Sequence, residues 1–198
     1  MKKTILLLFT ALFVCLQIAA ERKVATYTSF GKEHDIEGVI NDNDELLVYI
    51  TVEGDRSDDE VMIMLRGVND IVAFRSSLIS VRDKYIEWKK VAEDNNVKHM
   101  LKPFDFKFPK IEVYWLGTKW YSSFARRVFA PDFLVNDEGV SSVVAGGEAQ
   151  YWDNEYITQK WYALFQNEDD INSLIDALDV VKIREQLEHQ VNVSDLFK

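Results

Sequence analysis

Residues 70–95 read DIVAFRSSLISVRDKYIEWKKVAEDN, and this stretch decides the fold. Its apolar residues recur at alternating spacings of 3 and 4, the period of an amphipathic α-helix, at Ile71, Phe74, Leu78, Val81, Tyr85, Trp88 and Ala92. Val72, Ile79 and Ile86 widen this stripe, which favours packing on a sheet over a coiled coil. We therefore expect one long central helix that covers a sheet.

Residue types also predict where this helix starts and which of its side chains face water. Asn69 or Asp70 is expected to cap its start, because a side-chain oxygen there can accept hydrogen bonds from unpaired backbone N–H groups. The charged residues off the stripe are expected to face water; they are Arg75, Arg82, Lys89 and Glu93.

Runs of β-branched and aromatic residues flank the helix and favour strands, because such side chains pack well on a pleated surface. We expect strands near residues 23–30, 35–41, 45–53, 60–66, 103–116, 119–130, 139–150 and 156–165. Strict alternation from Phe104 to Phe108 predicts one buried and one solvated face. Gly117-Thr118 is expected to form a tight hairpin turn, and Gly146-Gly147 to mark a bulge or a close backbone approach.

A second helix is expected from about Asp169, where acidic residues suit the positive end of the helix dipole. Its apolar stripe is Ile171, Leu174, Leu178 and Val181, and a bend or a second short helix is expected after Val181. This stripe matches Ile71, Phe74, Leu78 and Val81 at a constant offset of 100, which is either an internal repeat or the ordinary likeness of two amphipathic helices.

The predicted fold class is therefore α+β. We expect a mainly antiparallel sheet of about eight strands, with one long central helix and one C-terminal helix. If the offset marks a repeat, two β4α units form a two-layer arrangement.

The N-terminus has the order of a secretory signal peptide: two lysines, an apolar run, and small residues ending at Ala20. The apolar run is short for a membrane span, and no later stretch is apolar enough for one. The alternatives are a retained N-terminal helix or anchor, and lipid attachment at Cys15, although Val14 is larger than a lipidation site requires. We expect residues 1–20 to be removed and residues 21–198 to form one domain, exported by a bacterium-like route to the periplasm, cell surface or medium.

The composition argues against several classes of partner and chemistry. A net charge of −10 repels phosphate backbones and anionic membranes, so a nucleic-acid partner is not expected. Cys15 is the only cysteine, so residues 21–198 hold no disulfide and no thiolate nucleophile. The chain lacks a Gly-x-Ser-x-Gly elbow and a His-Glu-x-x-His pair, and the loop from Asp55 to Asp59 departs from a calcium-binding loop. We expect no metal and no cofactor, and ordinary surface or boundary roles for His34, His99 and His189.

Four aromatic residues beside expected turns are the candidate ligand-binding residues: Trp115, Trp120, Tyr121 and Trp152. Exposed flat rings stack on sugars or hold protein partners, whereas buried rings would only fill a core face. The sequence thus favours an exported, non-enzymatic binding or interaction domain whose ligand is a glycan or an envelope protein. A carboxylate-dependent hydrolase outside the cytoplasm and a structural envelope component remain as alternatives, and the oligomeric state is open.

Overall fold

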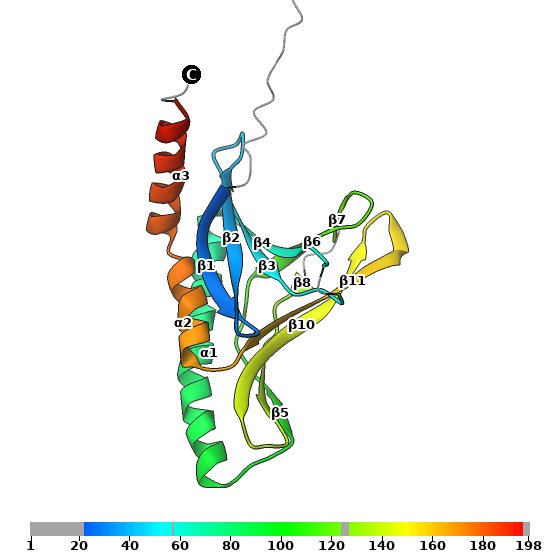
Figure 1. The fold of residues 1–198 in the computed structure, drawn as a ribbon, viewed down its shortest axis with the longest axis vertical. Coiled ribbons are helices and arrows are strands. Elements are labelled where there is room, and N and C mark those ends of the chain that lie inside the picture. Colours follow the sequence, from blue (N-terminus) through cyan, green and yellow to red (C-terminus); the bar gives the residue numbers. More distant parts are fainter. Residues whose placement is uncertain (1–21, 57, 124–126, 196–198) are drawn as a thin grey trace, which may run out of the picture.

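A computed structural model describes residues 22–56, 58–123 and 127–195, which form an α+β fold (Figure 1). Within these residues, eleven strands pair antiparallel in two sheets, and three helices lie along one side. The first sheet has the order β1-β2-β3-β4-β6-β7, with β8 also paired to β6, and the second has the order β11-β10-β9-β5. The α+β prediction is confirmed, with two sheets where one was expected. The expected signal peptide lies outside the described residues.

The first half of the chain contains four sequential antiparallel strands that lead into a helix, whereas the second half contains seven strands before its two helices. The first half comprises β1 (Arg22–Ser29), β2 (Lys32–Ile40), β3 (Leu46–Val52), β4 (Val61–Arg66) and α1 (Gly67–Asp94). The second half comprises β5 (Met100–Pro103), β6 (Lys110–Leu116), β7 (Trp120–Ser122), β8 (Arg127–Val128), β9 (Asp132–Val135), β10 (Ser141–Tyr151), β11 (Asn154–Phe165), α2 (Glu168–Ala177) and α3 (Val180–Asp195). Strands β5, β9, β10 and β11 form the second sheet, and β6, β7 and β8, which lie between β5 and β9 in the chain, extend the first sheet.

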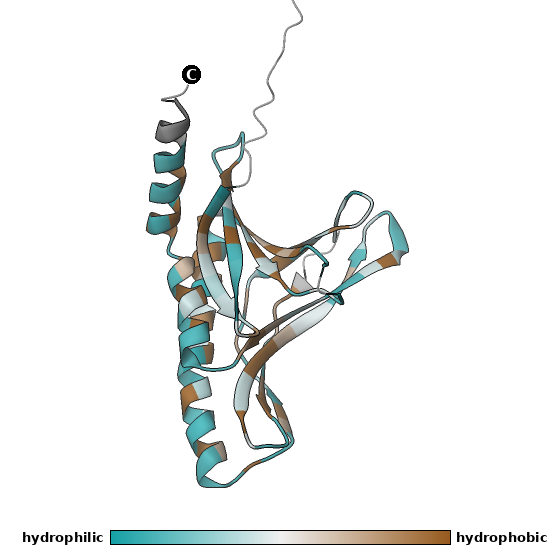
Figure 2. Ribbon diagram, viewed as in Figure 1, coloured by the Kyte–Doolittle hydropathy of each residue, from teal (hydrophilic) through white to brown (hydrophobic). Residues whose placement is uncertain are grey.

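Helix α1 buries most of the predicted apolar stripe against both sheets, but Val72 and Ile86, which were expected to widen it, are exposed. Its buried residues are Ile71, Phe74, Leu78, Val81, Tyr85 and Ala92, and one hydrophobic core joins them to residues of both sheets and the other helices. Burying each large apolar side chain contributes about 1.5–3 kcal/mol. Figure 2 shows hydrophilic residues on the outer side of the helices and apolar residues on the side that faces the strands.

The start of α1 differs from the prediction. The helix begins at Gly67, directly after β4, and Arg66 at the N-cap position makes no side-chain capping bond to the described residues. Gly67 has φ 76°, a conformation that glycine adopts readily, and it turns the chain from strand into helix. Asn69 and Asp70 therefore lie inside the first turn, and their expected capping role is wrong.

The charged residues of α1 were expected to face water, but two of them contact another helix. Arg75 Nε donates a 2.8 Å hydrogen bond to the backbone oxygen of Ile175, and Arg82 Nη1 donates one of 3.1 Å to Asn172 Oδ1. Both acceptors belong to α2, so these arginines connect the two helices.

The C-terminal helices contain the expected break, but it lies at Leu178 and Asp179, before Val181 rather than after it, and this changes which residues are buried. Asn167 caps α2 by accepting a hydrogen bond from the backbone N–H of Asp170, and α2 ends at Ala177 with Leu178 at its C-cap. Val181 is 65% exposed, because the chain turns at Leu178 and Asp179 before α3 begins, and Ile183 and Leu187 are buried in its place.

Residues 104–109 were expected to continue a strand, and in the described structure they lie outside any strand. The alternation is still correct, because Phe104 and Phe108 are buried whereas Asp105 and Lys107 are exposed. Pro103 is the last residue of β5 and Pro109 directly precedes β6, so a residue without the backbone N–H that a ladder requires stands at each end of this gap. Strand β9 was missed by the sequence analysis.

The glycine pair in β10 confirms the expected close approach. A Cβ on Gly147 would lie 3.2 Å from Nε1 of the buried Trp161, and one on Gly146 would lie 2.9 Å from the Trp161 backbone oxygen. The register shift in β10 falls later, between Gln150 and Tyr151.

Backbone pairing connects the two sheets at their edges in the described part of the chain. Glu53, after β3, exchanges backbone hydrogen bonds of 3.0 and 2.8 Å with Tyr162 of β11, and Ser123 bridges to Tyr151 of β10. Strands β3, β4, β6, β7, β10 and β11 are thereby connected in a ring. None of the helices in the described part of the chain is long and apolar enough to cross a lipid bilayer.

Candidate functional site

The hairpins β6–β7 and β10–β11 bring most of the predicted aromatic residues together. Gly117 forms the expected turn, and its N–H donates to the backbone oxygen of Lys119. Trp115 stacks on Tyr121 with ring centres 5.8 Å apart, and Tyr121 meets Tyr151 edge-on at 5.0 Å. Tyr151 in turn contacts Trp152 at 5.7 Å. A continuous series of rings therefore runs from the core to the surface and couples the two hairpins.

Lys119 covers this aromatic series from the β6–β7 turn. Its Nζ lies 5.6 Å from the ring centre of Tyr121 and 5.5 Å from that of Tyr151, within the range of cation–π attraction. The hydroxyl groups of Thr118 and Tyr121 lie 3.0 Å apart and share a hydrogen bond. Lys119 thus contacts both hairpins, whereas the Thr118–Tyr121 bond lies within β6–β7 alone.

Trp120 lies on the opposite face of the first sheet, because side chains alternate along β7. It lines a pocket of about 210 Å³ together with Tyr49, Met62 and Tyr114. Its side chain is 47% exposed, and Trp152 is 59% exposed at the other hairpin, whereas Trp115 is only 3% exposed. Of the four predicted residues, Trp115, Tyr121 and Trp152 thus belong to one aromatic series and Trp120 to a separate pocket.

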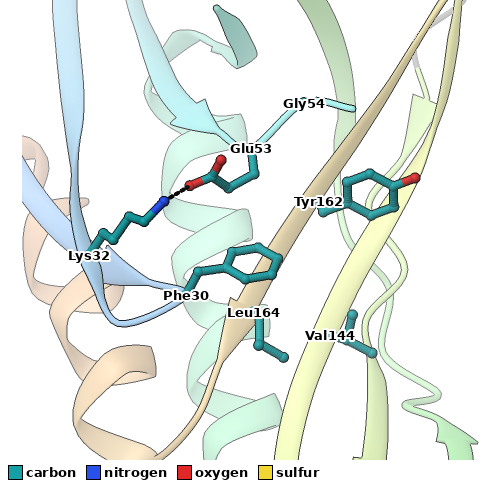
Figure 3. A pocket seen from close by; sticks show the side chains of 7 residues that line it. All are labelled: Phe30, Lys32, Glu53, Gly54, Val144, Tyr162 and Leu164. Carbon is teal, nitrogen blue, oxygen red and sulfur yellow. Dashed lines mark hydrogen bonds and ion pairs between the residues drawn. The ribbon is translucent and has the colours of Figure 1, made fainter. Parts of the chain in front are cut away.

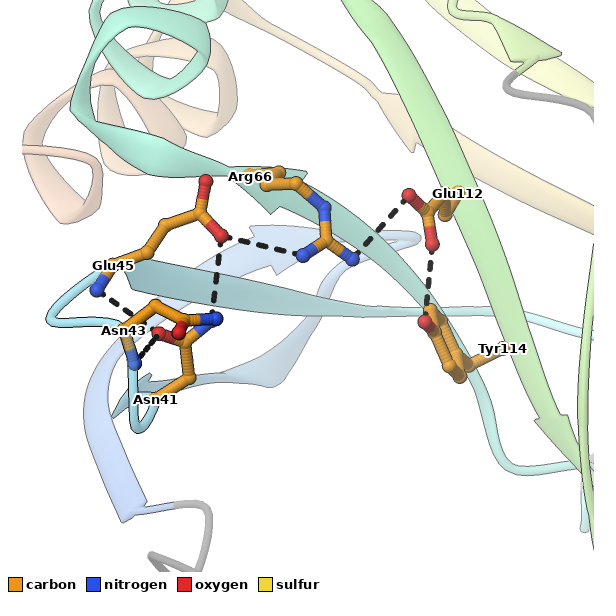
Figure 4. Close-up of polar contacts among 6 residues, drawn as sticks. All are labelled: Asn41, Asn43, Glu45, Arg66, Glu112 and Tyr114. Atoms are coloured by element: carbon orange, nitrogen blue, oxygen red, sulfur yellow. Dashed lines mark hydrogen bonds and ion pairs between the residues drawn. The ribbon is translucent and has the colours of Figure 1, made fainter.

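A polar network borders the Trp120 pocket (Figure 4). The Tyr114 hydroxyl donates a 3.1 Å hydrogen bond to Glu112 Oε2, and Arg66 Nη2 lies 3.5 Å from Glu112 Oε1. Arg66 Nη1 donates a 3.3 Å bond to Glu45, which also accepts one from Asn41 Nδ2. Burial, and then the charge of Glu112, raise the pKa of the Tyr114 hydroxyl above its ordinary value, so Tyr114 stays a neutral donor. The pocket therefore has aromatic walls beside charged groups held in place.

No family model, curated protein or solved structure matches this chain with significance.

Sequence reasoning did not select Tyr49, Met62 or Tyr114 as site residues. They come from β3, β4 and β6, and only the register brings them together, since Met62 pairs with Tyr114 and Tyr49 with Met64. Alternation places Tyr114 on the face opposite Trp115, but the pairing of β4 with β6 carries no local sequence signal.

A second and larger pocket, of about 500 Å³, lies where the two sheets meet (Figure 3). Its lining residues are Phe30, Lys32, Glu53, Gly54, Val144, Tyr162 and Leu164. Lys32 Nζ lies 3.4 Å from Glu53 Oε1. His34, for which an ordinary surface or boundary role was expected, lies in β2 and is nearly buried, with Nε2 3.7 Å from the same oxygen.

In the loop between β3 and β4, the Asp59 carboxylate accepts hydrogen bonds from within the protein. Asp59 Oδ2 accepts hydrogen bonds of 2.9 Å from the Arg56 backbone N–H and from Gln159 Nε2 of β11. These bonds lower the pKa of Asp59 below its ordinary value, with the Arg56 N–H as the largest cause. Among the described residues, no group of three or more acidic or histidine side chains is placed to hold a metal ion.

Proposed function

We propose that this protein is an exported, non-enzymatic glycan-binding domain and that the Trp120 pocket holds a sugar ring. The supporting observation is a half-exposed indole at a pocket whose other walls include the rings of Tyr49 and Tyr114. The apolar face of a sugar stacks well on such rings. A volume of about 210 Å³ is smaller than the roughly 300–1,000 Å³ of drug-sized pockets, which suits one ring rather than a chain.

The bordering charges favour neutral or amino sugars over acidic ones. Arg66 pairs with both Glu45 and Glu112, so this group of side chains has one positive and two negative charges. The whole chain has a net charge of −10. An acidic sugar would meet repulsion at this surface, whereas a neutral or amino sugar would not.

Calorimetric titration with neutral, amino and acidic oligosaccharides tests this proposal. We expect binding of a neutral or amino sugar, and a loss of at least about tenfold in affinity for Trp120→Ala. Trp152→Ala is the matched control, since it removes an exposed tryptophan outside the pocket and should bind as the unaltered protein does. Absence of binding across the panel, or full binding by Trp120→Ala, would overturn the proposal.

Two further measurements separate binding from the alternatives. Chromatography of the glycan after long incubation should recover it intact, whereas cleavage would favour the carboxylate-dependent hydrolase. Export is tested by N-terminal sequencing of the native protein, which should begin at Glu21 rather than Met1.

An envelope-protein ligand is the second candidate, favoured by the other hairpin. Trp152 and Tyr156 are 59% and 88% exposed at the β10–β11 turn, where exposed rings can anchor a protein partner. In that case Trp152→Ala, and not Trp120→Ala, would abolish capture of the partner.

A further inference from the structure

The turn between β1 and β2 holds a large aromatic residue in an unfavourable backbone conformation. Phe30 and Gly31 connect Ser29 to Lys32 and have φ values of 52° and 69°. Two positive φ values in a two-residue turn favour Asn and Gly, and a bulky residue is disfavoured there. Backbone strain of this kind persists when the surroundings enforce it, and it gathers at ligand sites.

The surroundings of Phe30 enforce this conformation. Its N–H donates a 2.9 Å hydrogen bond to the backbone oxygen of Leu164 in β11. The ring nevertheless remains 37% exposed, at the pocket where the two sheets meet (Figure 3). The strained turn thus presents an apolar ring to a pocket instead of burying it.

The opposite side of this pocket is also apolar. Val144 and Leu164 are paired across β10 and β11, and Tyr162 pairs with Gly146. A Cβ on Gly146 would lie 3.0 Å from Tyr162 Cδ1, so the glycine leaves room for the tyrosine ring. The volume of about 500 Å³ falls within the roughly 300–1,000 Å³ of small-molecule sites.

Glu53 is the only acidic residue among the described lining residues. Its backbone is fixed by the two hydrogen bonds to Tyr162, and its side chain is 23% exposed. The Lys32 side chain that contacts it at 3.4 Å is 66% exposed, and such exposed ion pairs are weak. A ligand cation can therefore replace Lys32 beside Glu53.

We propose that this pocket binds a small amphipathic amine, with an aromatic or apolar body and one ammonium group. The body packs between Phe30, Tyr162 and Leu164, and the ammonium pairs with Glu53. The ring faces of Phe30 and Tyr162 add cation–π attraction, and the net charge of −10 disfavours anions. The described lining residues of this pocket and of the Trp120 pocket do not overlap, so this site is independent of glycan binding.

Three probes of matched size test the charge requirement: phenethylamine, 2-phenylethanol and 3-phenylpropionate. Calorimetric titration at neutral pH should give binding of phenethylamine, and affinities at least about tenfold weaker for the other two, because only the amine pairs with Glu53. Equal affinities for the three probes, or no binding of phenethylamine at millimolar concentration, would overturn the proposal.

Variants of the full chain then assign the residues. Glu53→Gln should weaken phenethylamine about tenfold, whereas Lys32→Gln should strengthen it severalfold by removing the internal competitor. Phe30→Asn should also weaken it, and asparagine suits the positive φ, so folding is preserved. Trp120→Ala is the control and should bind the amine normally. Full affinity in both Glu53→Gln and Phe30→Asn, with circular dichroism unchanged, would contradict the assignment.

Discussion

Arg75 Nε donates a 2.8 Å hydrogen bond to the backbone oxygen of Ile175, one hundred positions further along the chain. Ile175 lies in the last turn of α2, where backbone oxygens have no partner within the helix. The charged side chain of one helix therefore satisfies the C-terminal end of the other, and it holds α1 and α2 together.

Arg75→Ala should lower the free energy of unfolding by about 1–3 kcal/mol, because it removes a charged hydrogen bond from a partly buried carbonyl. Urea unfolding followed by circular dichroism measures the change. Lys90→Ala removes an exposed cation from the same helix and should stay within about 0.5 kcal/mol of the unaltered protein. Equal effects of the two variants would show that the Arg75 bond contributes nothing.

Gly147→Ala should destabilise the protein by about 1–3 kcal/mol, because buried rings resist displacement. The new Cβ would lie 3.2 Å from Nε1 of Trp161, which is 1% exposed. Thermal unfolding and near-ultraviolet circular dichroism report the change. Glu148→Ala, at an exposed neighbouring position, is the control. Wild-type stability and an unchanged tryptophan signal in Gly147→Ala would refute the close approach.

Stability should fall in alkaline solution above pH 10. Burial, and then the charge of Glu93, raise the pKa of Tyr85 from 10.0 to about 12. As pH rises, the unfolded state therefore loses the Tyr85 proton before the folded state does. The contribution of Tyr85 to the free energy of unfolding is complete below pH 10 and is lost as pH rises toward 12. Urea unfolding measured between pH 10 and pH 12 should show that the free energy of unfolding falls less steeply with pH in Tyr85→Phe than in the unaltered protein. An unchanged slope would exclude Tyr85 as a cause.

Stability should also fall in acid, because Asp59 stabilises the folded protein only while its carboxylate is ionised. Its lowered pKa means that the folded protein keeps the carboxylate ionised below 3.8, where the unfolded chain takes up a proton. The stability it provides is present above pH 3.8 and is lost as pH falls through the folded pKa. Asp59→Asn should be less stable than the unaltered protein at neutral pH, with the difference closing in acid. Asp58→Asn, at an exposed position one residue earlier, is the matched control. A constant difference at all pH values would argue against the ionised Asp59 contacts.

The elements with long, regular patterns could be predicted from the sequence. The stripe from Ile71 to Ala92 was recognised because burial follows a helical period over several turns. The errors arose where a local feature overrode the pattern: Pro103 and Pro109 remove ladder donors around Phe104, and the turn at Asp179 redirects the stripe away from Val181.

The site was only partly predictable because strand pairing is not local. The aromatic positions were visible in the sequence, but their division between a ring series and the Trp120 pocket depends on the pairing of β4 with β6. Similarly, Phe30 and Leu164 lie far apart in the chain, and nothing near either residue indicates their contact.

The bridge between Glu53 and Tyr162 also bears on how the molecule assembles during synthesis. The segment that carries Glu53 leaves the ribosome long before β11 is made, so the ring of strands stays open until nearly the whole chain has emerged. Contacts between such distant positions slow folding, and the open strand ends can pair with other chains meanwhile. A nascent chain that stops before β11 would therefore be prone to aggregate, and a holding chaperone would be most useful at that stage.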